Sequence, residues 1–280
     1  MKKYELTSEF VTNDFGKKLF RIKALVSFGN VKEGQLGGFI EKEDNLSHDG
    51  NAWVTGDALV ADNARVTGNA LVTDNARVTG DARVTGDALV TDNARVTDNA
   101  RVTGDALVTG NALVTDNARV TGDARVTGDA RVTDNARVTD NARVTGDALV
   151  ADNARVTGNA LVTDNARVTG DARVTGDALV TDNARVTGDA RVTGDARVTG
   201  DADYAVVKGF GRYFRATTFF RCVDKILRVQ CGCFYGDLTQ FREIVKKTHG
   251  DSKYAKEYLA IADLMELHFS DAEAKQEVSE

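Results

Sequence analysis

The chain has 280 residues, with 36 basic and 42 acidic side chains, a formal net charge of −6, three cysteines and no proline. This composition rules out a disulfide scaffold, and it lacks the overall basic balance that is typical of nucleic-acid-binding domains. No apolar segment is long enough to span a membrane, and the amino terminus has no apolar signal core, so we expect a cytoplasmic protein without a membrane partner.

Residues 1–51 differ from the following chain by their content of Lys, Glu and aromatic residues. Residues 19–26 alternate between apolar and polar side chains in the manner of a β-strand, and residues 37–40 form an irregular start to the repeats. The open end of a repeat array exposes strand edges and apolar side chains. We therefore predict an N-terminal β cap over residues 1–51, with Trp53 packed against it.

Residues 52–201 consist of one hexad, Ala-(Arg/Leu)-Val-Thr-(Gly/Asp)-(Asp/Asn), which recurs 25 times without an insertion. A short, fixed period is typical of a solenoid. Side chains alternate along the first four residues, so Ala and Val share one face while Arg or Leu and Thr share the other. Val and Thr favour strands, and Gly, Asp and Asn tolerate the left-handed backbone of a corner. The hexad thus predicts a coil of short parallel strands with Ala and Val stacked inside.

Residues 202–280 predict a separate α+β domain. Its expected strands cover residues 204–207, 212–220 and 226–230, and two helices cover residues 238–247 and 253–269. Asp237 is a candidate N-cap for the first helix, and Asp251 or Ser252 for the second. Five residues at helical spacing should form the buried side of the second helix: Tyr258, Ile261, Ala262, Met265 and Phe269.

The spacing of an aliphatic residue and a small one four positions later, as in Val54 and Ala58, resembles the hexapeptide repeat of the trimeric LpxA-like superfamily. Residues 35–47, 232–236 and 248–251 are similar to the ends of uncharacterised bacterial and prophage hexapeptide-repeat proteins. The resemblance covers the whole chain and implies a mainly β fold, a left-handed parallel β-helix with three hexads per coil. The 25 hexads would then form about eight coils between the two caps. A phage or mobile-element association is implied as well, but no mechanism.

Acyltransferases of this superfamily use a histidine as general base in the groove between subunits. The histidines of this chain, His48, His249 and His268, lie outside the repeats, which also lack Lys, Ser, Tyr and Glu. General acid–base catalysis requires a tuned titratable group beside the substrate. We therefore expect a non-enzymatic protein with no catalytic residue and no cofactor. A degenerate acyltransferase-like protein is the alternative.

Cys231 and Cys233, together with Cys222 and His249, raise the question of a zinc site. Their spacing lacks a paired Cys-x-x-Cys motif, so we expect no metal, and we expect one strand to hold Cys231 and Cys233 as small core residues. Thr occurs in 23 of the 25 hexads and raises a second question, that of an ice-binding surface. Because Thr would lie on all faces of the coil, we do not favour that function.

Three outward columns follow from stacking every third hexad. One of them, the Arg column, holds only arginine: Arg65, Arg83, Arg101, Arg119, Arg137, Arg155, Arg173 and Arg191. It predicts either a ladder for a nucleic acid or another polyanion or, as the favoured interpretation, guanidinium groups paired with corner Asp residues above stems that cover the sheet.

A second column starts at Trp53 and contains five leucines that we call the Leu strip: Leu71, Leu89, Leu107, Leu161 and Leu179. The third column mixes Leu and Arg. A row of outward leucines predicts self-association or a protein partner. The expected function is that of a structural or interaction rod, with polyanion binding through the Arg column as an alternative.

Overall fold

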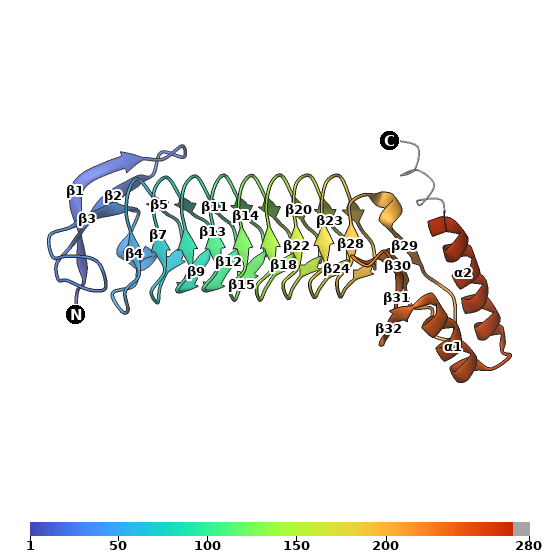
Figure 1. Cartoon of the computed structure of the whole chain (residues 1–280). Helices are drawn as coiled ribbons and strands as arrows, with labels where there is room; N and C mark the ends of the chain where they lie inside the picture. Colours follow the sequence, from blue (N-terminus) through green and yellow to red (C-terminus); the bar gives the residue numbers. More distant parts are fainter. Residues whose placement is uncertain (271–280) are drawn as a thin grey trace.

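The computed structural model describes residues 1–270 and shows a straight β-solenoid with a β cap at its amino end and an α+β unit at its carboxyl end (Figure 1). Each strand of the solenoid pairs in parallel with the strand 18 residues later, as Arg65 does with Arg83 and Leu71 with Leu89. Three hexads therefore make one turn, as the repeat predicts.

The solenoid has three faces, each a stack of parallel strands. The Arg face has eight strands: β6 (Arg65–Val66), β9 (Arg83–Gly86), β12 (Arg101–Gly104), β15 (Arg119–Thr121), β18 (Arg137–Val138), β21 (Arg155–Val156), β24 (Arg173–Val174) and β27 (Arg191–Val192). The Leu face has nine: β4 (Trp53–Val54), β7 (Leu71–Val72), β10 (Leu89–Val90), β13 (Leu107–Val108), β16 (Arg125–Val126), β19 (Arg143–Val144), β22 (Leu161–Val162), β25 (Leu179–Val180) and β28 (Arg197–Val198). The mixed face consists of β5 (Leu59–Val60), β8 (Arg77–Val78), β11 (Arg95–Val96), β14 (Leu113–Val114), β17 (Arg131–Val132), β20 (Leu149–Val150), β23 (Arg167–Val168) and β26 (Arg185–Val186).

The interior of the coil is a continuous stack of Val and Ala. Between Ala52 and Val198, every Ala at the first position of a hexad and every Val at the third is at most 1% exposed. The corners turn through left-handed residues, for example Asp98 with a φ of 58° and Gly104 with a φ of 77°. A Cβ atom at Gly104 would lie 3.0 Å from the backbone nitrogen of Gly122 in the next coil, so glycine relieves a tight contact at a corner position that Asp also occupies in other coils.

The N-terminal cap extends the sheet of the mixed face. Strands β1 (Tyr4–Thr12), β2 (Lys18–Ala24) and β3 (Leu36–Ile40) are antiparallel neighbours, and β3 pairs in parallel with β5. Lys3 Nζ donates a hydrogen bond to the carbonyl of Ala52 at 2.9 Å, and Asn45 Nδ2 donates to that of Ala64 at 2.9 Å. These groups satisfy carbonyls that the first coil would otherwise leave unpaired. Trp53 is 2% exposed with its ring 5.4 Å from that of Phe28, which confirms that it packs against the cap.

The C-terminal unit contains an antiparallel sheet of β29 (Tyr204–Val207), β30 (Thr217–Arg221), β31 (Leu227–Cys231) and β32 (Phe234–Asp237), followed by helices α1 (Leu238–His249) and α2 (Lys253–Ser270). The two faces of β30 have different partners. Phe220 joins the Val and Ala core at the end of the solenoid, whereas Phe219 packs on Phe241 of α1, with 6.2 Å between ring centroids. Strand β30 therefore connects the core of the solenoid with the core formed by the helices.

Two expectations for this unit were wrong. Residues 212–216 form a loop instead of the first half of a strand, because Phe214 has a left-handed backbone with a φ of 52°. Cys231 ends β31 and Cys233 is exposed in the hairpin turn to β32, so these cysteines do not share one strand. The expected N-cap at Asp237 is confirmed, since its side chain accepts a hydrogen bond from the backbone of Gln240.

Candidate functional site

The parallel register of the Arg face aligns all eight residues of the Arg column. Arg101 lies opposite Arg119, and Arg119 opposite Arg137, in neighbouring strands. Neighbouring strands are about 4.8 Å apart, so the column is a straight ladder of roughly 34 Å. Most of its side chains are exposed, and those of Arg137 and Arg191 are half-buried.

The eight guanidinium groups have no ion-pair partner within residues 1–270. The ion pairs that solenoid residues form in this part of the chain all join a coil to a cap: Lys17 with Asp62, Asp14 with Arg77, and Lys208 with Asp189. The expected pairing of the Arg column with corner Asp residues is therefore absent from the described structure.

The corner side chains beside the Arg column bond to each other instead. Asn63 Nδ2 donates to Asp81 Oδ1 at 3.0 Å, and Asn153 Nδ2 donates to Asp171 Oδ1 at 3.1 Å, each across one turn of the coil. These carboxylates therefore bond along their own column, and neither forms an ion pair with an arginine within residues 1–270. The Arg column therefore lies beside a second column of Asn side chains and of Asp side chains that accept hydrogen bonds from Asn.

A groove runs between these two rows. Three hollows follow one another along it, with volumes of about 390, 270 and 420 Å³ from the amino to the carboxyl end. Each residue of the Arg column lines at least one of them. We call this feature the Arg groove, and its second wall consists of Asn63, Asp81, Asn99, Asn117, Asn135, Asn153, Asp171 and Asp189. From Asn99 to Asn153 the residues that line this wall are amides, and each follows an Asp of the same corner: Asp98, Asp116, Asp134 and Asp152.

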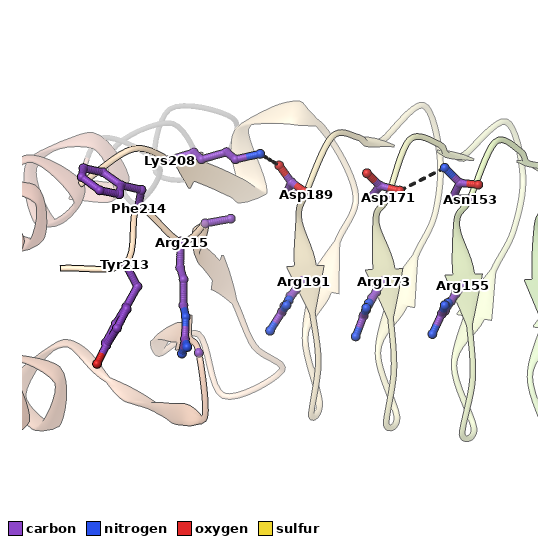
Figure 2. Close-up of a pocket in the computed structure, with 12 residues that line it drawn as sticks. Asn153, Arg155, Asp171, Arg173, Asp189, Arg191, Lys208, Tyr213, Phe214 and Arg215 are labelled. Carbon is purple, nitrogen blue, oxygen red and sulfur yellow. Dashed lines mark hydrogen bonds and ion pairs between the residues drawn. The ribbon is translucent and has the colours of Figure 1, made fainter. Parts of the chain in front are cut away.

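The groove ends against the C-terminal unit. Figure 2 shows Arg155, Arg173 and Arg191 in a row, with Arg215 beyond the last of them. Lys208 pairs with Asp189, the wall residue of the final coil. The negative charge of Asp189, the wall carboxylate closest to this end, is thereby balanced by a lysine.

The Leu strip is less prominent than its sequence suggests. Leu71, Leu89 and Leu107 follow one another on the Leu face, but Arg125 and Arg143 separate them from the remaining two leucines of the strip, Leu161 and Leu179. All five side chains are half-buried.

The histidines lie in the caps. His48 Nδ1 accepts a hydrogen bond from the backbone of Lys3 at 3.2 Å, and its ring lies 4.4 Å from that of Tyr4. The ring of His249, at the end of α1, lies 5.8 Å from that of Tyr258. Neither lines the Arg groove. These contacts are those of packed side chains at the ends of the rod.

The cysteines occupy three different environments. Cys222 is buried at the end of the solenoid, and burial raises the pKa of its thiol to about 12. Cys231 is half-buried and Cys233 exposed, and all three are free thiols. Among residues 1–270, no three His, Cys, Asp or Glu side chains gather in an arrangement that could hold a metal ion.

Neither α1 nor α2, the helices that the structure describes, has the length and apolar character needed to cross a bilayer.

No protein-family model and no curated protein sequence matches this chain. Two solved acyltransferase structures are similar to it. The UDP-N-acetylglucosamine acyltransferase of Francisella novicida is 15% identical with a TM-score of 0.27, over 58% of this chain and 67% of that one. LpxA of Acinetobacter baumannii is 10% identical with a TM-score of 0.27, over 56% of this chain and 69% of that one. The fold described above comes from the strand pairing alone, and these similarities assign no activity.

Proposed function

We propose that this chain is a non-enzymatic rod that binds a linear anionic polymer lengthwise in the Arg groove. The observation that carries the proposal is the ladder of eight arginines without ion-pair partners in residues 1–270. Like charges at this separation repel by about 1 kcal/mol per pair in water, before screening by salt. A bound polyanion would replace that repulsion by attraction.

The straightness and regular spacing of the ladder favour a polymer over a small ligand. Each turn of the solenoid repeats the same cation, so a chain with repeated anionic groups could meet one arginine after another. Binding several such groups on one chain raises affinity through the effective concentration of the second and later contacts. The release of counterions from the polymer adds to it.

The chemistry of the groove supports binding without catalysis. Arg remains protonated at any pH that a protein encounters, and the Asn side chains of the wall do not titrate. None of the three histidines lines the groove. The carboxylates of its wall are already engaged, since Asp81 and Asp171 accept hydrogen bonds from Asn63 and Asn153, and Asp189 pairs with Lys208. The groove thus offers mainly hydrogen-bond donors and positive charge.

The setting of this activity is also part of the proposal. Three free thiols suit a reducing compartment, and we place the protein in the cytoplasm on that basis. The phage or mobile-element association rests on the resemblance of the chain ends. Self-association through the Leu strip is a weaker candidate, because its five side chains are half-buried and interrupted by two arginines.

Two matched double variants test the proposal. Arg119→Ala with Arg137→Ala removes two neighbouring cations from the Arg groove, and Arg125→Ala with Arg143→Ala removes two neighbouring cations from the Leu face. We expect the wild type to bind long-chain polyphosphate and oligonucleotides with an affinity that falls steeply between about 50 and 200 mM salt. The first variant should bind more weakly, and the second should bind like the wild type. Equal weakening by both variants, or no binding by the wild type at low salt, would overturn the proposal.

A further inference from the structure

The loop of residues 212–216, between β29 and β30, exposes two aromatic side chains at the carboxyl end of the Arg groove. Tyr213 is 61% exposed and Phe214 is 67% exposed, and both line the last hollow of the groove (Figure 2). Neither ring belongs to a core cluster of the described residues. Large aromatic side chains outside any core are typical of contact surfaces.

Two guanidinium groups lie over the Tyr213 ring. The guanidinium carbon of Arg215 lies 4.9 Å from the ring centroid and that of Arg212 lies 5.5 Å away. Arg215 therefore has two roles in this geometry. It supports the aromatic ring, and it adds a cation beyond Arg191 at the end of the ladder (Figure 2).

The backbone of the loop is strained at one of these aromatic residues. Phe214 has a φ of 52°, in the left-handed region that bulky residues seldom adopt. Strained residues persist where the surrounding structure imposes them, and they are concentrated at binding sites. Here the strained conformation presents an apolar ring to solvent at the end of a cationic groove.

We propose that the polymer bound in the Arg groove is a single-stranded nucleic acid whose bases stack on Tyr213 and Phe214. This inference rests on the proposed function and adds the class of ligand. Proteins that bind single strands combine a positively charged groove along the backbone with aromatic rings on which bases stack. The Arg groove supplies the first part, and the loop of residues 212–216 supplies the second part where the groove ends.

The shape of the ladder favours a single strand over a duplex. The eight arginines form a straight row of roughly 34 Å, which is about the length of one full turn of B-form DNA. Each strand of a duplex winds around the helix axis over that distance, so its phosphates would leave the row within part of a turn. Its bases are also paired inside the helix and unavailable to Tyr213. An extended single strand can follow the row and present an unpaired base at its end.

The experiment compares three fluorescently labelled ligands of about 15 nucleotides on the full-length chain: oligothymidylate, an abasic oligonucleotide with the same backbone, and a duplex. We expect the wild type to bind oligothymidylate roughly tenfold more tightly than the abasic strand. Tyr213→Ala with Phe214→Ala should lower the affinity for oligothymidylate to that for the abasic strand and leave the latter unchanged. Arg119→Ala with Arg137→Ala should weaken both.

The outcomes separate this inference from the proposed function. Equal affinity of the wild type for oligothymidylate and the abasic strand would overturn base stacking while polyanion binding stands, and so would tighter binding of the duplex. Failure to bind any of the three ligands would overturn this inference, and failure to bind long-chain polyphosphate as well would overturn both. Tyr213→Trp retains a ring at the same site, so it should keep the preference for oligothymidylate, and losing that preference would also count against stacking.

Discussion

Arg119 and Arg137 lie opposite each other in the neighbouring parallel strands β15 and β18, and neither guanidinium group has an acidic partner within residues 1–270. Like charges directly opposite each other in a sheet are destabilising. The Arg column repeats this unfavourable contact at each turn, so its cost to folding must be offset by the Val and Ala core. Positions that reduce stability in the free protein are expected where a ligand supplies the missing interaction.

The first prediction compares two arginines of different columns. Arg137 has Arg119 and Arg155 as strand neighbours, whereas Arg131 has Leu113 and Leu149. Arg137→Thr should therefore be more stabilising, or less destabilising, than Arg131→Thr by roughly 0.2–1 kcal/mol at low salt. Thermal unfolding followed by circular dichroism measures the difference. It should shrink as salt screens the repulsion, and a difference independent of salt would contradict repulsion within the column.

The second prediction concerns pH and the N-terminal cap. Burial lowers the pKa of Lys3 to about 8, although Asp49 opposes the shift. Between pH 8 and the unfolded value near 10.5, unfolded Lys3 binds a proton that folded Lys3 does not. The free energy of unfolding should therefore rise with pH in this window, by at most about 1.4 kcal/mol per pH unit. Below pH 8 the cost of burying the charge is fully present.

The window has an upper limit set by Tyr4. Burial raises the pKa of this phenol, so it stays protonated in the folded cap while the unfolded residue ionises at about pH 10. Stability should fall again above that pH. Fluorescence of Trp53, the one tryptophan of the chain, reports unfolding of the cap in thermal melts from pH 7 to about 9.5. Lys3→Met should abolish the rise, and an unchanged rise in that variant would assign it to another group.

The third prediction separates stability from binding in the loop of residues 212–216. Glycine adopts a left-handed backbone freely, so Phe214→Gly should relieve the strain and stabilise the protein by up to about 1 kcal/mol. It should also weaken binding of oligothymidylate, because a stacking ring is lost. Tyr213 has no left-handed backbone, and Tyr213→Gly should weaken binding and lower the melting temperature. Equal effects of the two variants on melting temperature would mean that Phe214 is not strained.

The solenoid was predictable because each position of the hexad recurs with the same environment. Val and Ala alternate with outward residues, and a turn residue follows at a constant distance, so 25 copies specify the inward face and the corners. The alignment of the Arg column follows from three hexads per turn. The absence of ion pairs does not follow, because it depends on how the corner Asn and Asp side chains bond across turns.

In the C-terminal unit, the pattern of residue types did not predict the start of one strand correctly. Residues 212–220 are rich in aromatic and β-branched residues and so predict one strand, but the strand begins at Thr217. No residue type in this segment predicts the left-handed backbone of Phe214, which is imposed by the tertiary structure. Tyr213 and Phe214, the residues of the proposed stacking site, were therefore not singled out from the sequence. The available signal was a pair of adjacent aromatic residues between Arg212 and Arg215.

The last prediction tests whether the Arg column acts as one continuous ladder. Removing 18 residues, 124–141, takes out one full turn, so Arg119 would be followed by Arg155 in the same column. Removing six residues, 124–129, shifts all later hexads by one face. Arg119 would then be followed by Arg143, with Leu161 and Leu179 after it, and the ladder would be split between two faces.

Both deletions should leave a folded rod. Any hexad can stack on any other, and the caps contact only their own ends of the solenoid, as Lys3 does with Ala52 and Thr218 with Arg191. The stability of a repeat array is close to a sum of repeat and neighbour terms, so we expect the two melting temperatures to differ by no more than a few degrees. The affinity for long-chain polyphosphate should be nearly that of the wild type after the 18-residue deletion and clearly lower after the six-residue deletion. Equal affinities in two folded variants would show that the arginines bind independently of their alignment, and the ladder would then have no role as a unit.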